Sequence, residues 1–290
     1  MSGGCDYLRP RNLAEALELR AEHPATSGWI VLAGGTDVLV SASHRPEPAG
    51  ILDLWRLGAL GGIRVERDHE RGGQGKGDRI VLGAGVTWLE VQRSPLVLQH
   101  LPILVEAARE IGALQIQARG TLGGNIATSS PVGDSLPVLL ALEAELELAS
   151  VRGTRLLPYC DFCTGYRKTL LAADELVTAV HIPMPGHGVR QRWRKVGTRR
   201  AQSISKVMGA AAIAMEGDVV KRACVALSAV ADRPIRIAAI EQAVVGLPWA
   251  KAAEAARAAV AGSIKPLTDL RSSREYRVQV AENLVARFFS

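Results

Sequence analysis

The sequence predicts a mixed α/β protein built from three lobes. Segments with the apolar spacing of helices alternate with short apolar runs of the kind that form strands. The 29 glycines and 14 prolines, with only 4% aromatic residues, are typical of an α/β protein with many tight turns. At 290 residues the chain can form more than one packed unit. Glycine and proline clusters at residues 58–62 and 183–188 predict lobes at 1–60, 61–186 and 187–290.

The first lobe is predicted to contain a helix followed by strands. Asn12 and Glu15 have the spacing of a capping box at a helix start, and Pro24 is expected to end that helix. Residues 29–33 predict a short buried strand, and residues 51–54 predict another. A glycine pair follows the first of these strands directly, so its backbone N–H groups can face an anion.

The second lobe begins with a predicted hairpin whose arms are residues 63–65 and 80–84. Thr87 and Glu90 again have capping-box spacing. Helical periodicity over residues 102–111 predicts a further helix, which should end at the following glycine.

Later elements of the second lobe are predicted in the same way. A helix is expected from Asp134 or Ser135 to about residue 142. Residues 145–149 and 155–157 form a predicted hairpin, with residues 177–182 as a further strand.

The third lobe is predicted to contain a hairpin of residues 210–215 and 223–230, followed by alanine-rich helices.

The net charge of +6 suggests a nucleic-acid partner. However, Arg190, Arg192 and Arg194 alternate with other residues, which predicts one solvated face of a strand. No RNP, zinc-finger or helix-turn-helix pattern accompanies them, so we expect no nucleic-acid binding.

The cysteines and the apolar segments indicate the cellular compartment of the protein. Four scattered cysteines are too few for a disulfide framework in a chain of this size. The first ten residues lack the pattern of a secretory signal, and no apolar segment approaches the ~18 residues of a membrane span. We therefore expect a cytoplasmic protein with no membrane span.

Two glycine clusters about ninety positions apart carry the strongest functional signal. Taken alone, Gly34-Gly35 could be a turn and Gly123-Gly124 a bulge. A dinucleotide pyrophosphate, however, needs several backbone N–H donors at close approach, which residues without a bulky Cβ permit. The glycines around residues 75–85 match neither the Rossmann nor the P-loop pattern.

Longer motifs around these clusters resemble one protein family. The residues in question are 33–37 (AGGTD), 117–125 (QARGTLGGN), 130–134 (SPVGD), 161–169 (DFCTGYRKT), 174–177 (DELV) and 195–196 (KV). In this order they resemble the FAD-binding medium subunit of the molybdenum hydroxylases. That group includes the medium subunit of aerobic carbon monoxide dehydrogenase and the flavin domain of xanthine dehydrogenase, and the resemblance covers essentially the whole chain.

The resemblance implies a vanillyl-alcohol-oxidase-type fold, with FAD held between two α/β subdomains and a C-terminal α/β domain beside them. The implied cofactor-binding residues come from both glycine loops and from the segments that follow. They are Leu32, Ala33, Gly34, Gly35, Thr36, Asp37, Val38, Ile111, Gly120, Thr121, Gly123, Gly124, Asn125, Thr128, Ser130, Asp134, Val177 and Lys195. By the same resemblance, Thr128, Ser130 and Asp134 lie near sugar or ribityl hydroxyls, and Val177 and Lys195 lie near the flavin ring. From its residue type alone, Asp134 could equally be a helix N-cap.

The chain departs from the family pattern at two places. Ile111 stands where vertebrate-type xanthine dehydrogenases carry an aromatic residue against the flavin, so the resemblance does not extend to an NAD-reducing site of that kind, and NAD, oxygen and a quinone all stay open as the final acceptor. Cys163 replaces the usual Phe and creates a C-x-x-C pair with Cys160. Because no second pair and no nearby His accompany it, we expect neither a metal site nor a redox role.

The resemblance also implies what lies on other chains. No set of four spaced cysteines is available for a [2Fe-2S] cluster, and the six histidines form no catalytic or metal pattern. We therefore expect non-covalent FAD here, with two [2Fe-2S] clusters on a small partner subunit and the molybdopterin cofactor on a large one, in a dimer of heterotrimers. The predicted function is an oxidoreductase subunit that relays electrons from the [2Fe-2S] subunit to an external acceptor, with no catalytic side chain of its own. The alternative is a self-sufficient FAD-dependent oxidase of small alcohols or lactones.

Overall fold

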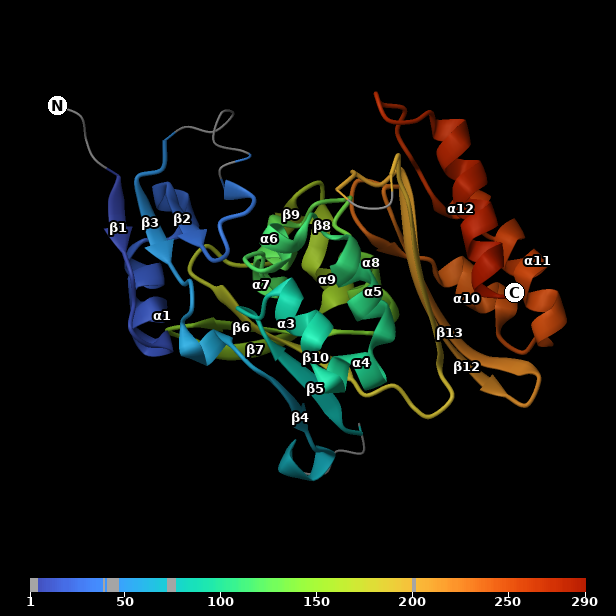
Figure 1. The fold of residues 1–290 in the computed structure, drawn as a ribbon, viewed down its shortest axis with the longest axis horizontal. Coiled ribbons are helices and arrows are strands. Elements are labelled where there is room, and N and C mark those ends of the chain that lie inside the picture. The colour runs from blue at the N-terminus through green and yellow to red at the C-terminus, as the bar shows by residue number, and fades with distance from the viewer. Residues whose placement is uncertain (1–4, 39, 41–46, 72–76, 200–201) are drawn as a thin grey trace.

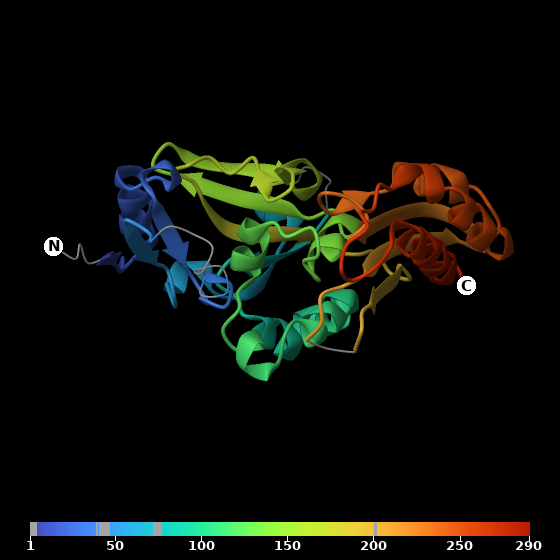
Figure 2. The same cartoon turned by 90° about the horizontal axis from the view of Figure 1, so that it is seen from above.

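The computed structural model describes residues 5–38, 40, 47–71, 77–199 and 202–290. Figure 1 shows three sheet-containing parts in a row from the N-terminal to the C-terminal end of the molecule, and Figure 2 shows the same row from above. The three larger sheets lie within residues 6–53, 63–183 and 190–236. Because each sheet falls inside one predicted lobe, we keep 1–60, 61–186 and 187–290 as proposed domain limits.

The N-terminal part is a three-stranded parallel sheet in the order β1-β3-β2, packed against helix α1. Asn12 is the N-cap of α1, and its Oδ1 accepts a hydrogen bond of 2.9 Å from the N–H of Glu15. Strand β2 lies at an edge of the sheet, and of its residues only Trp29 is buried, which corrects the predicted burial. The elements are β1 (Asp6–Leu8), α1 (Leu13–Glu22), η1 (Ala25–Ser27), β2 (Trp29–Leu32), β3 (Gly50–Asp53) and η2 (Gly58–Leu60).

The central part is a five-stranded antiparallel sheet in the order β4-β5-β10-β6-β7. Both predicted hairpins, β4 with β5 and β6 with β7, are confirmed. Helices α3, α4 and α5 lie in front of this sheet in Figure 1. The strands are β4 (Ile63–Glu66), β5 (Arg79–Gly83), β6 (Glu145–Ser150), β7 (Gly153–Pro158), β8 (Cys163–Gly165), β9 (Lys168–Thr169) and β10 (Leu176–Pro183). The helices are η3 (Asp68–Arg71), α3 (Trp88–Arg93), α4 (Pro95–His100), α5 (Pro102–Glu110), α6 (Leu114–Gln117), α7 (Leu122–Thr128), α8 (Leu136–Ala141) and α9 (Tyr159–Phe162).

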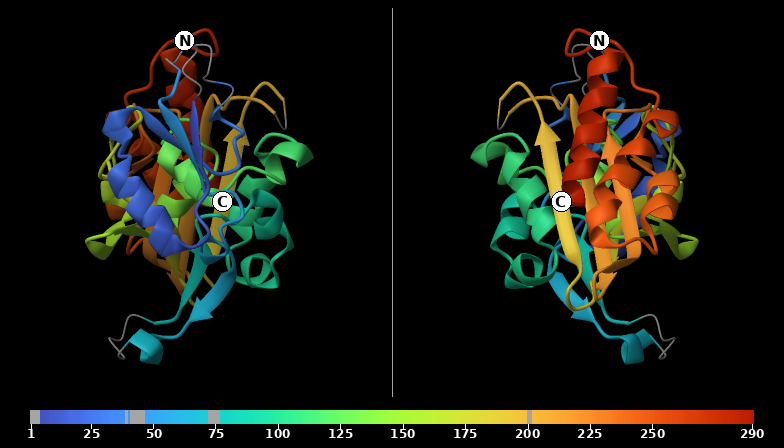
Figure 3. Two further views of the ribbon diagram at one scale, coloured as in Figure 1. Left: turned by 90° about the vertical axis from the view of Figure 1, so that its left-hand side faces the viewer. Right: turned by 90° about the vertical axis from the view of Figure 1, so that its right-hand side faces the viewer.

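The C-terminal part is a four-stranded antiparallel sheet in the order β11-β12-β13-β14. In the right-hand view of Figure 3, the orange and red helices α10 to α12 cover its outer face. On β11, Arg190, Arg192 and Arg194 are exposed whereas Trp193 and Lys195 are buried, as the alternation predicts. The elements are β11 (Arg190–Val196), β12 (Val207–Glu216), β13 (Val219–Ser228), β14 (Ile235–Arg236), α10 (Ala238–Val244), α11 (Trp249–Ala258), η4 (Ala261–Ser263) and α12 (Arg274–Phe288).

The hydrophobic cores cross the limits between the three parts. The core of the central sheet includes Trp193, Ala210 and Ala226 from the C-terminal sheet. Leu176 of β10 packs with Leu52 in the N-terminal core. Since buried apolar contacts hold the parts together, a residue of one part can take a fixed position beside another part.

Candidate cofactor site

The first glycine loop leaves β2 with its N–H groups unpaired. The N–H groups of Gly34, Gly35 and Thr36 donate no hydrogen bond to any residue that the structure describes. Gly35 has φ of +76°, a left-handed conformation that glycine adopts without strain. Leu32 and Ala33 lead into this loop, and the O atom of Leu32 accepts a 2.7 Å hydrogen bond from the N–H of Leu54. Adjacent unpaired N–H groups of this kind are suited to an anionic group.

The second glycine loop is fixed against the connection between β5 and α3. The N–H of Trp88 donates to the O atom of Gly120 (3.1 Å), and the N–H of Leu122 donates to the O atom of Val86 (2.9 Å). Thr121 lies between these two bonds and is the N-cap of α7. Its Oγ1 accepts a 3.1 Å hydrogen bond from the N–H of Gly124.

Gly123 has a steric reason to lack a side chain. Its N–H donates to the O atom of Ala84 at 2.8 Å. A Cβ atom at this position would lie 2.6 Å from the Cβ of Ala84, closer than real Cβ atoms approach. Gly123 of the second loop therefore packs against Ala84, whereas the N–H groups of the first loop have no acceptor among the described residues.

The two loops meet although 85 positions separate Gly34 from Arg119. A Cβ atom on Gly34 would collide with the carbonyl O of Arg119 and lie 3.1 Å from the Cα of Gly120. A Cβ atom on Gly120 would lie 3.4 Å from Oγ1 of Thr36. The fold thus brings the two predicted glycine clusters into backbone contact.

The polar side chains after the second loop make local hydrogen bonds. Thr128 Oγ1 donates to the O atom of Gly124 (2.9 Å), and Asn125 Oδ1 accepts from Ser135 Oγ (2.7 Å). Ser130 Oγ accepts from the N–H of Val132 (3.4 Å). These contacts order the segment that continues to Asp134.

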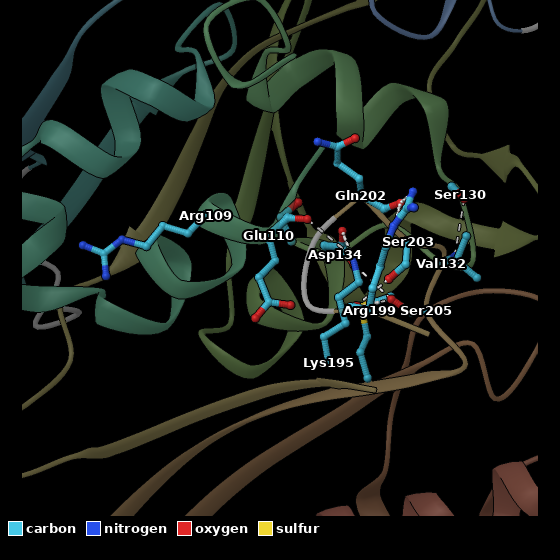
Figure 4. Close-up of polar contacts among 12 residues, drawn as sticks. Arg109, Glu110, Ser130, Val132, Asp134, Lys195, Arg199, Gln202, Ser203 and Ser205 are labelled. Carbon is cyan, nitrogen blue, oxygen red and sulfur yellow. Dashed lines mark hydrogen bonds and ion pairs between the residues drawn. The ribbon is translucent and has the colours of Figure 1, made fainter. Parts of the chain in front are cut away.

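Asp134 is held by the C-terminal sheet. Its Oδ2 lies 2.8 Å from Lys195 Nζ and its Oδ1 accepts a 3.1 Å hydrogen bond from Ser205 Oγ, so both side chains converge on it in Figure 4. The side chains of Asp134 and Lys195 are only 13% and 2% exposed. Burial raises the pKa of Asp134 above its usual value, and the Lys195 ammonium opposes this rise. The N-cap of α8 is Ser135, so Asp134 does not cap that helix.

The backbone of the same segment is also tied to the C-terminal sheet. The indole N–H of Trp193 donates to the O atom of Asp134 at 3.3 Å. The N–H of Ala229, which follows β13, donates to the O atom of Pro131 at 2.9 Å. No local sequence pattern indicates this connection, because its partners are distant in sequence, and only the family resemblance points to Lys195.

The remaining predicted positions lie around these loops. Lys195 Nζ also reaches the O atom of Glu110 at 3.5 Å, which places Lys195 beside Ile111 at the end of α5. Val177 is buried in β10 at a register shift in its pairing with β6. Asp37 and Val38 follow the first loop and have hydrogen-bond or electrostatic partners of their own.

The cysteine pair does not form a common site. Cys160 is exposed on α9, whereas Cys163 is buried and its Sγ lies 3.2 Å from Ser129 Oγ. Within the described residues, no group of three or more His, Cys, Asp or Glu side chains could hold a metal ion.

A cavity of about 330 Å³ lies away from the glycine loops. Its lining includes Cys160, Arg79 and Arg236 but none of the predicted cofactor residues. We favour the glycine loops as the cofactor site, because the arginines that line this cavity already form ion pairs, Arg79 with Glu145 and Arg236 with Glu143.

Two protein-family models together match most of the chain. Residues 3–185 match the model of the FAD binding domain in molybdopterin dehydrogenase. The chain belongs to this family. Residues 192–290 match the CO dehydrogenase flavoprotein C-terminal domain. The expected cofactor FAD, the oxidoreductase class and the fold are thereby confirmed. The loops fit such a cofactor for two reasons. The N–H groups of the first loop have no partner among the described residues, and the loops lie so close together that a Cβ on Gly34 would collide with the second loop.

Relatives span nearly the whole chain. The xanthine dehydrogenase FAD-binding subunit of Escherichia coli O157:H7 is 30% identical over 287 residues, which cover 98% of this chain and 94% of the relative. The carbon monoxide dehydrogenase medium chain of Hydrogenophaga pseudoflava is 29% identical, covering 97% of this chain and 94% of that one.

Solved structures show the same similarity in three dimensions. A chain of carbon monoxide dehydrogenase from Hydrogenophaga pseudoflava superposes with a TM-score of 0.90 and 29% identity, covering 98% of this chain and 95% of that one. A chain of quinoline 2-oxidoreductase from Pseudomonas putida 86 gives a TM-score of 0.87 and 27% identity, covering 99% and 95%. Among the described residues, no helix is both long and apolar enough to cross a bilayer.

Proposed function

We propose that this chain is the FAD-carrying electron-transfer subunit of a heteromeric molybdenum hydroxylase. It would receive electrons from a [2Fe-2S] partner subunit and pass them to an external acceptor. The observation that carries the proposal is the backbone contact between two glycine loops, one of which has three successive N–H groups without a partner among the described residues. Both loops lie in residues 3–185, which match the FAD-binding domain model. FAD suits this role because it can accept electrons singly and deliver them in pairs.

The residues of this chain would bind and orient the cofactor. The N–H groups of Gly34, Gly35 and Thr36 are proposed to donate to the pyrophosphate. Gly120, Thr121, Gly123, Gly124 and Asn125 would form the opposite wall. Ile111, Val177 and Lys195 would lie toward the flavin ring, and Thr128, Ser130 and Asp134 toward the ribityl chain or ribose. Attachment is proposed to be non-covalent.

Partners follow from the same proposal. The small subunit would carry two [2Fe-2S] clusters and the large subunit the molybdopterin cofactor, in a cytoplasmic dimer of heterotrimers. Support comes from relatives that are themselves named as subunits or medium chains of dehydrogenases. Purification of the native chain with everything bound to it, followed by mass spectrometry of the chains and of the released cofactors, would test this composition.

An anaerobic reduction experiment separates a relay subunit from a self-sufficient oxidase. The isolated chain, loaded with FAD, should keep its flavin absorbance when aldehydes, N-heterocycles, carbon monoxide, small alcohols or lactones are added. Dithionite should still bleach it. Adding the iron–sulfur and molybdenum chains should make bleaching depend on the substrate of the complex. Turnover of any of these compounds with oxygen by the isolated chain would instead establish the oxidase.

A further inference from the structure

Trp55 follows β3 and is anchored to the N-terminal sheet. Its backbone N–H donates a 2.8 Å hydrogen bond to Oδ1 of Asp53, and Asp53 is buried, with 6% of its surface exposed. The hydroxyl of Tyr7 in β1 donates to the other oxygen of Asp53. The backbone of Trp55 therefore has a fixed position relative to β1 and β3.

Arg119 connects Trp55 to both glycine loops. Its guanidinium carbon lies 3.8 Å from the centroid of the Trp55 ring, a stacked cation–π arrangement. Its Nε donates to the O atom of Gly34 at 3.4 Å. In the chain, Arg119 immediately precedes Gly120, so its backbone belongs to the second loop while its side chain contacts the first.

The hydrogen bond from Arg119 to the Gly34 carbonyl affects the orientation of the Gly35 N–H. The carbonyl of Gly34 and the N–H of Gly35 share one planar trans peptide and point in opposite directions. A donor on the Gly34 oxygen therefore fixes the direction of the Gly35 N–H, which is unpaired among the described residues. Gly35 has no Cβ and φ of +76°, so this peptide would otherwise reorient readily.

We propose that Arg119, held by Trp55, is a positioning residue that presets the Gly35 N–H for an anionic cofactor group. Arg119 acts through the Gly34 peptide rather than by touching the cofactor, and Trp55 fixes the guanidinium. This inference rests on the proposed function, because it takes the first loop as the pyrophosphate site. It adds a residue pair, Trp55 and Arg119, that joins the two loops to the N-terminal sheet.

The chain offers a matched control for this pair. Arg56 also lies over the Trp55 ring, with its guanidinium carbon 5.8 Å from the centroid, and it is exposed. Among the hydrogen bonds of the described residues, none joins Arg56 to a glycine loop. Arg56→Gln thus removes a cation near the same indole without removing the Gly34 contact.

The test measures FAD affinity and apo-protein stability side by side. We expect Arg119→Gln and Trp55→Leu each to weaken FAD binding about three- to tenfold, the range of a partly exposed cation–π contact with its hydrogen bond. The double variant should bind no more weakly than the worse single one, because both remove the same support. Arg119→Lys should recover part of the affinity, and Arg56→Gln should stay within about twofold of wild type. The urea midpoint of the apo-protein should be alike for Arg119→Gln and Arg56→Gln.

A second readout does not depend on FAD. In glycine-selective ¹⁵N spectra of the apo-protein, the Gly35 amide resonance should move in Arg119→Gln and not in Arg56→Gln. Wild-type protein that binds no FAD would overturn the proposed function itself. Wild-type binding with unchanged affinity and an unmoved Gly35 resonance in Arg119→Gln would overturn the positioning role alone, as would multiplying effects in the double variant.

Discussion

The ammonium nitrogen of Lys195 lies 2.8 Å from Oδ2 of Asp134 and joins β11 to the segment before α8. Removing either partner would leave a buried charge without compensation, which typically costs about 3–5 kcal/mol. Asp134→Asn should therefore lower the free energy of unfolding by about 3 kcal/mol, measured by urea titration. The exposed pair Arg11–Glu15 supplies the control, since Glu15→Gln should cost less than about 1 kcal/mol. Equal losses in the two variants would contradict the assignment of a buried interdomain ion pair.

Gly34→Ala is expected to damage both stability and FAD retention. The added methyl group would meet the backbone O of Arg119, which cannot move aside as a flexible side chain could. Overpacking of this kind costs about 1–3 kcal/mol or more. Gly186→Ala is the matched control because nothing lies within 4 Å of a Cβ there. Purified Gly34→Ala protein with a full complement of flavin and an unchanged melting temperature would rule out close contact between the loops.

Acid should destabilise the protein partly through Glu175. Two hydrogen bonds from Arg155 (2.7 and 2.8 Å) hold the pKa of Glu175 below its ordinary value of 4.5. The unfolded chain then binds a proton at a higher pH than the native state does, so this stabilisation is present above pH 4.5 and is lost as the pH falls below it. Urea midpoints between pH 6 and pH 3.5 should fall more gently for Glu175→Gln than for wild type. Glu254→Gln, which removes an exposed carboxylate of α11, is the matched control for the lost charge.

The two cysteines of the C-x-x-C pair should differ in reactivity. Cys160 is exposed, so a chromogenic thiol reagent should modify it in the native protein before Cys163 and Cys224, which are buried. The Cys160→Ser, Cys163→Ser double variant should retain FAD, because a hydroxyl at position 163 can still bond Ser129. Stoichiometric metal in the wild type that disappears in this variant would overturn that expectation.

Local signals in the sequence predicted the elements they control. The Thr87 capping box forms as expected, with Thr87 N–H to Glu90 at 2.8 Å and Glu90 N–H to Thr87 Oγ1 at 3.2 Å. At α1 only half of the box forms, because the Glu15 carboxylate accepts from the N–H of Arg11 rather than from Asn12. Such contacts involve neighbours three or four positions apart, which a sequence pattern can specify.

Long-range pairings could not be predicted in this way. Nothing near β1 indicates that it pairs in parallel with β3, and the glycine-rich residues 122–128 form helix α7 despite their low helix propensity. Tertiary contacts decide both cases, as they decide the pairing of Asp134 with Lys195. The chemistry of the glycine loops was predictable from residue type, whereas their mutual contact depends on the whole fold.

The ties between the C-terminal sheet and residues 131–134 also constrain the order of events during synthesis. Pro131 and Asp134 are bonded by Trp193, Lys195, Ser205 and Ala229, all of which leave the ribosome later. Translation proceeds at roughly 5–20 residues per second, so residues 131–134 are synthesised several seconds before the last of these partners. A fragment that ends at residue 185, between the two family domains, would contain Pro131 and Asp134 but none of these four bonding partners.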